Sequence, residues 1–304
     1  MYTDFSGLSR LRPTGSSLRL LHGSPLLLLM AACVVAAFSP AAARASSQAA
    51  QDATVEALHR PFDDILDMYV RDGMVYYRAL RLERGRFDRY VASLDVPAAT
   101  YSGWTRERQM AFWINAYNAF VLRTVIDHYP IRGRAAEFPA NSIRQIPGAF
   151  ERVRHRAAGR SVTLDEIEKT ILPEFKEPRV FLALGRGALG SGRLRSEAFT
   201  AARLAQQLDR VQSEFVTEQS MMRIAHSEGV LAVTPIVSWN ADHFIAAYDP
   251  GEQGPHANRS PIERAILAFV TPHLLPIERE FVQKHQFTVA YHQLDWRLND
   301  LTGR

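Results

Sequence analysis

The segment Gly185-Arg186-Gly187-Ala188-Leu189-Gly190 and the residues after it hold the side chains of this chain that are best placed to do chemistry. Ser191 could act as a nucleophile if a histidine such as His243 served as its base, which is the pairing that serine hydrolases and acyl-transferases need. The G-x-S-x-G spacing of a nucleophile elbow is absent, because Leu189 and Arg193 stand where the two glycines belong. A hydrolase or acyl-transferase is therefore an alternative hypothesis here.

The same segment could instead bind an anion through its backbone N–H groups, helped by Arg186 and Arg193. The alternative interpretation is a flexible surface loop whose arginines are solvated, because glycine in loops usually serves turn geometry. The G-x-G-x-x-G spacing also occurs in dinucleotide-binding folds, where the third glycine opens a helix at once. Here residues 191–195 intervene and no parallel strand-helix units flank the motif. We therefore predict no dinucleotide and no other cofactor.

A long helix expected over Thr105 to His128 must position a second group of candidates. Its apolar residues recur at the i, i+3, i+4, i+7 spacing over most of the circumference, so the helix should be buried. Trp113, Asn115 and Asn118 lie within it, and a buried amide without partners costs about 1–3 kcal/mol. The asparagines should therefore either bind the backbone of a neighbouring loop, which we favour, or hold a ligand in a cleft.

Metal and thiol chemistry have little support in the sequence. The histidines show no H-E-x-x-H or equivalent ligand spacing, so no metal site is predicted. Cys33 is the single cysteine, which excludes an internal disulfide.

The remaining pattern predicts an α+β fold, because strands come as hairpins and singles between helices without regular βαβ alternation. A first helix is expected to begin at Pro61. Further helices are expected over Arg78–Leu94, Thr163–Leu172, Glu197–Glu218, Pro261–Phe269 and Pro276–Lys284. The expected strands are Val75–Tyr77, Glu151–Arg156, Arg160–Val162, Arg179–Leu184, Met221–His226, Val230–Thr234 and Gln286–Tyr291.

The N-terminus is typical of an export signal. Three arginines precede an uncharged apolar run of about 13 residues from Leu26 to Phe38, shorter than the roughly 20 that span a bilayer. Ala43-Arg44-Ala45 supplies the small residues of a cleavage site. We therefore expect a signal peptide over 1–45, a disordered lead-in over 46–56, and one domain over 57–304 in the periplasm or outside the cell.

Two further observations concern the partners of the mature protein. Leu29 to Cys33 resembles a lipoprotein box, so a membrane anchor is expected only if Cys33 is lipidated. The formal charge of the chain is +4, and residues 1–45 carry +3 of it, from four arginines and one aspartate. The net charge of the remaining residues, +1, is too small to favour nucleic acid binding.

Several stretches resemble the domain of unknown function 547 family, which is common in exported bacterial proteins and present in plant proteins. The residues that carry the resemblance are Asp72–Tyr77, Ala111–Ala119, His128–Ile131, Ser161–Leu172, Glu177–Leu184 and Leu294–Asn299. The chain departs from the family at two positions, because Arg186 and Ser191 stand where members typically have cysteines. If those cysteines form a disulfide in relatives, this chain has lost a covalent link; if one is a nucleophile, its chemistry is altered.

Our first hypothesis is an exported domain that binds a small ligand, a glycan or an envelope partner in a cleft near the long helix and the segment from Gly185 to Arg195. The alternative is a hydrolase or acyl-transferase with a papain- or transglutaminase-like mechanism, in which Arg186 and Ser191 replace the cysteines typical of the family. Ser191 and His243 are then the candidate catalytic residues.

Overall fold

The long helix α5, Arg106–His128, is the element on which the N-terminal half of the molecule is built. A computed structural model describes residues 57–284 and 286–302 of the protein. Thr105 opens α5 by accepting a hydrogen bond from the backbone N–H of Arg108, and most of the helix is buried, as its apolar pattern predicts. The expected signal peptide, Cys33 and the lead-in over 46–56 lie outside the described residues.

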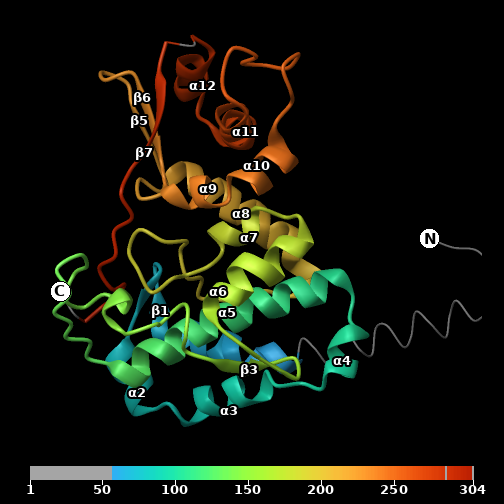
Figure 1. The fold of residues 1–304 in the computed structure, drawn as a ribbon, viewed down its shortest axis with the longest axis vertical. Coiled ribbons are helices and arrows are strands. Elements are labelled where there is room, and N and C mark those ends of the chain that lie inside the picture. The colour runs from blue at the N-terminus through green and yellow to red at the C-terminus, as the bar shows by residue number, and fades with distance from the viewer. Residues whose placement is uncertain (1–56, 285, 303–304) are drawn as a thin grey trace, which may run out of the picture. The chain divides into compact units, whose positions relative to one another are not determined.

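Short helices and a two-stranded hairpin surround α5 in Figure 1. The helix expected to begin at Pro61 covers residues 57–69. The single helix expected over Arg78–Leu94 is divided, with a break just before Gly85, because glycine weakens a helix interior. The elements of this part are β1 (Val70–Arg71), β2 (Met74–Val75), α2 (Tyr77–Leu82), α3 (Gly85–Ser93) and α4 (Ala98–Ser102).

In the middle of the chain, one predicted element has the wrong type. Arg179–Leu184, expected as a buried strand, begins as helix α7 (Arg179–Leu182), and the backbone N–H of Arg179 donates to the carboxylate of Glu177 at 3.2 Å. A short apolar run fits a buried helix as well as a strand, so periodicity could not decide between them. The elements before α7 are η1 (Ile143–Gln145), β3 (His155–Ala157), β4 (Arg160–Val162), α6 (Leu164–Glu166), η2 (Ile167–Ile171) and η3 (Leu172–Phe175).

The C-terminal half combines a three-stranded sheet with helices. Strands β5 (Met222–Ala225) and β6 (Val230–Val233) form the expected hairpin, and β7 (Thr288–Tyr291) adds to β6 in parallel. The helix expected from Glu197 begins only at Leu204, after an irregular segment. The helices here are η4 (Ala201–Arg203), α8 (Leu204–Thr217), α9 (Pro235–Trp239), α10 (Ala241–Tyr248), α11 (Pro261–Val270), η5 (Thr271–His273) and α12 (Pro276–Gln283).

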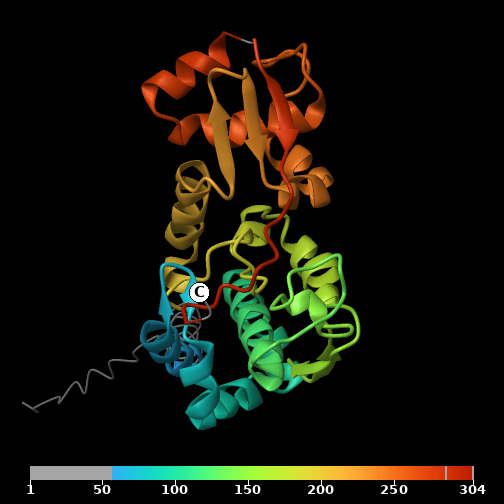
Figure 2. The ribbon, with the colours of Figure 1, turned by 90° about the vertical axis from the view of Figure 1, so that its left-hand side faces the viewer.

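The segment after β7 joins the two halves, because it returns from the sheet to the N-terminal hairpin, as Figure 2 shows. The backbone N–H of Val75 donates to the carbonyl of Asn299 at 2.8 Å, and Val75 pairs with Asp300 in a parallel bridge. These contacts confirm the predicted single α+β domain. Over 57–284 and 286–302, no helix is both long enough and apolar enough to cross a membrane.

Candidate functional site

The predicted glycine-rich segment lies within an irregular stretch, residues 183–200, that we call the strap. Between Gly185 and Leu194 only Leu189 and Arg193 are not buried. The interpretation as a solvated surface loop is therefore wrong for most of it, because the strap runs through the interior. Irregular chain can be buried only if its backbone groups find partners, and here side chains supply many of them.

Asn115 and Asn118 of α5 bind the strap's backbone. Asn115 accepts from the N–H of Phe199 at 2.9 Å and donates to the carbonyl of the same residue at 2.8 Å. Asn118 accepts from the N–H of Gly185 at 2.8 Å and donates to the carbonyl of Ala183 at 3.2 Å. Both amides are thus used in positioning the strap, and neither lines a pocket that we describe below.

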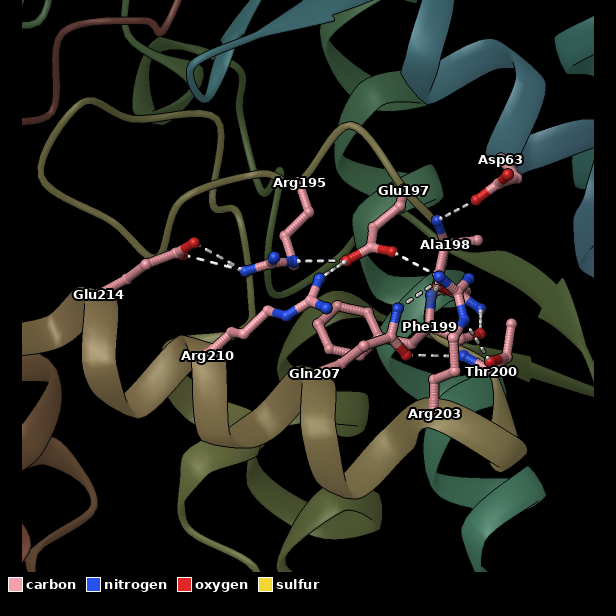
Figure 3. Close-up of polar contacts among 11 residues, drawn as sticks. Asp63, Arg195, Glu197, Ala198, Phe199, Thr200, Arg203, Gln207, Arg210 and Glu214 are labelled. Atoms are coloured by element: carbon pink, nitrogen blue, oxygen red, sulfur yellow. Dashed lines mark hydrogen bonds and ion pairs between the residues drawn. The ribbon is translucent and has the colours of Figure 1, made fainter.

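The C-terminal end of the strap is held in the same way from α8 and from the helix over 57–69, as Figure 3 shows. Gln207 accepts from the N–H of Thr200 at 3.0 Å and donates to the carbonyl of Ala198 at 2.8 Å. Asp63 accepts from the N–H of Ala198 at 2.8 Å. Glu197 pairs with several arginines around this end, namely Arg195, Arg203 and Arg210.

Arg186, a candidate for binding an anion, lies inside the molecule. Its guanidinium is 2% exposed and pairs with the Glu168 carboxylate at 2.5 Å. Burial lowers the pKa of Arg186, but Glu168 and Tyr117 raise it by more, so it stays above its ordinary value and the group is charged. The Tyr117 hydroxyl also donates to Glu168, at 3.0 Å. The guanidinium is therefore committed to the protein's own carboxylate.

Ser191 also serves the strap. Its hydroxyl accepts from the N–H of Arg186 at 3.0 Å and donates to the carbonyl of Ala188 at 2.8 Å. No imidazole is among its hydrogen-bond partners in the described part of the chain, and the His243 ring packs against Phe181 at 5.4 Å between centroids. The two positions at which the family typically has cysteines are thus in direct contact, but the structure does not bring Ser191 and His243 together as nucleophile and base.

Trp113 is fully buried. Its indole N–H donates to the Tyr101 hydroxyl at 2.7 Å, and the Arg160 guanidinium lies over its ring at 4.8 Å. This side chain therefore stabilises the packing of α4 and the β3–β4 hairpin against α5.

Two glycines allow the strap to approach its neighbours closely. A Cβ on Gly192 would lie 2.0 Å from the carbonyl oxygen of Leu182, and one on Gly190 would lie 2.4 Å from the backbone nitrogen of Asp295. Neither neighbour is a flexible side chain that could move aside. The glycine spacing therefore has a packing reason that needs no bound nucleotide.

A pocket of about 280 Å³ lies where the exposed turn of the strap meets three other parts of the chain. We call it the strap pocket. Its walls come from the β1–β2 turn, the strap, the end of α8 and the C-terminal segment. The lining residues are Asp72, Gly73, Met74, Ala188, Leu189, Ser191, Gly192, Arg193, Glu218, Ser220, Met221 and Asn299.

The rim of the strap pocket is charged. Arg193 donates to Asp72 at 2.9 Å, with side chains 38% and 93% exposed respectively, so both remain accessible to solvent. Glu218 adds a second carboxylate and Ser220 a hydroxyl. The Asn299 amide is already used, since it accepts from the Tyr77 hydroxyl and donates to the carbonyl of Gly73.

Of the candidate catalytic and ligand-binding residues, only Ser191 and Arg193 line this pocket. Asp72, Glu218 and Ser220 were missed as site residues. Asp72 begins a stretch that carries the family resemblance but has no site role in the sequence analysis, and the other two follow a helix with no motif around them. Nothing in their local sequence shows that the fold brings them beside Arg193.

Within the described ranges, no group of three or more histidine, cysteine, aspartate or glutamate side chains is arranged to hold a metal ion.

Comparison with known proteins gives one match. No curated protein and no solved structure matches the chain. Residues 101–216, which include α5, the strap and most of α8, match the model of DUF547, described as a protein of unknown function. The residues that clamp the strap, Asn115, Asn118 and Gln207, all fall inside that match.

Proposed function

We propose that the protein acts outside the cytoplasm and binds a small, hydroxyl-rich ligand, such as a sugar unit of an envelope glycan, in the strap pocket. The observation that carries the proposal is the rim, where the carboxylates of Asp72 and Glu218 and the guanidinium of Arg193 surround one hollow. These three charged side chains come from three segments that are distant in the sequence, and all three line the same pocket.

The chemistry of the rim favours a neutral polyol. Carboxylates accept hydrogen bonds from hydroxyl groups, and a guanidinium donates to hydroxyl or ring oxygens in a fixed geometry. The rim has an excess of one negative charge, which disfavours a simple anion. The volume of about 280 Å³ lies at the lower limit of small-molecule sites, so the ligand should be about as large as one monosaccharide.

The pocket is preorganised for binding because hydrogen bonds hold the strap beneath it in one conformation. Ser191 and the clamps at Asn115 and Asn118 hold the backbone through hydrogen bonds within the protein. A fixed wall reduces the entropy lost on binding. Only Arg193 and the rim carboxylates need to adjust.

Isothermal titration calorimetry with N-acetylglucosamine, glucose and a neutral disaccharide tests the proposal. We expect saturable heat from at least one sugar, and a loss of affinity of about tenfold in Arg193→Gln. Arg89→Gln, an exposed arginine on α3, is the matched control and should bind as the wild type does. Absence of heat from all three sugars, or equal binding by Arg193→Gln, would contradict the proposal.

Export is tested separately by mass spectrometry of the N-terminus of the protein purified from an expressing bacterium. A mature chain that begins at Ser46 would support a soluble exported protein. A chain that begins at a lipidated Cys33 would support an anchored one, and an intact Met1 would contradict export.

A further inference from the structure

A second pocket, of about 580 Å³, lies in the C-terminal half, away from the matched family region. We call it the helix pocket, because α11 and α12 supply most of its walls; the segment after α10 and the short helix η5 supply the rest. Its lining residues include Arg264, Leu267, Ala268, Arg279 and Val282. Its volume is typical of sites for small molecules, which range over roughly 300–1,000 Å³.

The floor of the helix pocket is apolar. Leu267 and Val282, both at most 1% exposed, belong to the hydrophobic core that lies beneath it. Ala268 and the rings of three prolines add further carbon surface around them. The i, i+3, i+4 spacing of Arg264, Leu267 and Ala268 places them on one face of α11, so the pocket follows from how the two helices pack.

Two arginines line this apolar pocket and differ in how they are neutralised. Arg264 is 6% exposed at its side chain, and its guanidinium donates twice to Asp249, at 2.8 and 2.9 Å. Arg279 donates only to the carbonyl of Leu274, at 3.1 Å, and no carboxylate of the described residues pairs with it. The pocket therefore combines carbon walls with one cation whose charge is not compensated.

We propose that the helix pocket binds a molecule with an apolar body and a single carboxylate, of the class of medium-chain alkanoic acids, with the carboxylate on Arg279. A guanidinium binds a carboxylate through two parallel hydrogen bonds. The chain of the ligand lies over Leu267, Ala268 and Val282. This site is independent of the sugar site proposed for the strap pocket.

Calorimetric titration of the full-length protein with decanoate, and with decanol as the uncharged analogue, tests the inference. We expect saturable decanoate binding, at least about tenfold tighter than that of decanol. Arg279→Gln should remove this preference, weakening decanoate about tenfold while leaving decanol unchanged.

Variants that fill the cavity locate the site. Ala268→Trp, on the exposed side of α11, should abolish binding of both ligands, whereas Ala92→Trp, at an exposed position of α3, is the matched control and should bind normally. If Ala268→Trp does not fold, the charge-selective effect of Arg279→Gln still decides the question. Decanol binding as tightly as decanoate, undiminished binding by a folded Ala268→Trp, or no saturable binding would each overturn the inference. Arg193→Gln should bind decanoate normally, which separates this result from the test of the strap pocket.

Discussion

The strap and the three-stranded sheet differ in which groups form hydrogen bonds with their backbone N–H and carbonyl groups. In the sheet, β5, β6 and β7 pair through regular ladders that do not depend on which side chains are present. In the strap, individual side chains such as Asn115, Asn118 and Gln207 bind the buried backbone. Stability around the strap should therefore depend on single polar residues, whereas in the sheet it is spread over many equivalent contacts.

The largest expected effect comes from the ion pair beneath the strap. Glu168→Leu would leave the Arg186 guanidinium buried without its carboxylate, and breaking such a pair costs about 3–5 kcal/mol of unfolding free energy. Urea denaturation measures the loss. Glu280→Leu, which breaks the exposed pair between Glu280 of α12 and Lys284, is the control and should leave the unfolding free energy close to that of the wild type. The double variant Glu168→Leu/Arg186→Met should recover much of the loss, and a loss below about 1 kcal/mol in Glu168→Leu alone would contradict the comparison.

Acid should destabilise the N-terminal part, because a fully buried imidazole lies there. Burial lowers the pKa of His59 from 6.5 to about 3, and its Nδ1 is 2.9 Å from the Tyr90 hydroxyl. The ring stays neutral in the folded protein but takes a proton in the unfolded chain below about pH 6.5. The stabilisation is therefore complete above pH 6.5 and is lost as the pH falls toward 3. At pH 4.5 the loss should be roughly 2–3 kcal/mol, at about 1.4 kcal/mol per pH unit.

Denaturant unfolding of the wild type and of His59→Phe between pH 7 and 4.5 separates this contribution from the general effect of acid. Stability of the variant should fall less steeply with pH. Parallel curves would show that His59 is not the group responsible. His155 is a second such group, because burial and the charge of Arg123 lower its pKa to about 4. The unfolding free energy of His155→Phe should therefore also fall less steeply with decreasing pH than that of the wild type.

Regular elements could be predicted from the sequence because their signals are local. The apolar period of α5, the reciprocal bonds between Thr163 and Glu166, and the hairpin between β5 and β6 need only neighbouring residues. The strap could not be predicted, since its conformation is set by side chains up to 135 residues distant in the chain, as with Asp63 and Ala198. The strap pocket could not be predicted for the same reason, because Asp72 and Arg193 meet only after folding.

Removing one clamp should cost less than breaking the ion pair. Asn115→Leu leaves the buried N–H and carbonyl of Phe199 without their partner, which should lower the unfolding free energy by about 2 kcal/mol. The matched change in the sheet is Thr288→Leu, at an exposed position of β7 whose ladder bonds are made by the backbone. That variant should stay within about 0.5 kcal/mol of the wild type by urea denaturation. Equal losses in the two variants would remove the distinction between strap and sheet.

The smallest expected effect concerns the start of α11, a regular element in which one side chain does bind the backbone. The Glu263 carboxylate accepts from the backbone N–H of Ser260 at 3.0 Å and from its hydroxyl at 2.9 Å, at a site exposed to water. Ser260→Ala should lower the unfolding free energy by about 1 kcal/mol, and Ser260→Gly by only a few tenths, measured by urea denaturation. The cost is smaller than at Asn115 because water can bind the groups that lose their partner at Ser260, whereas Phe199 is only 2% exposed. A loss in Ser260→Ala as large as that in Asn115→Leu would show that burial does not make the strap's polar contacts more important than a surface cap.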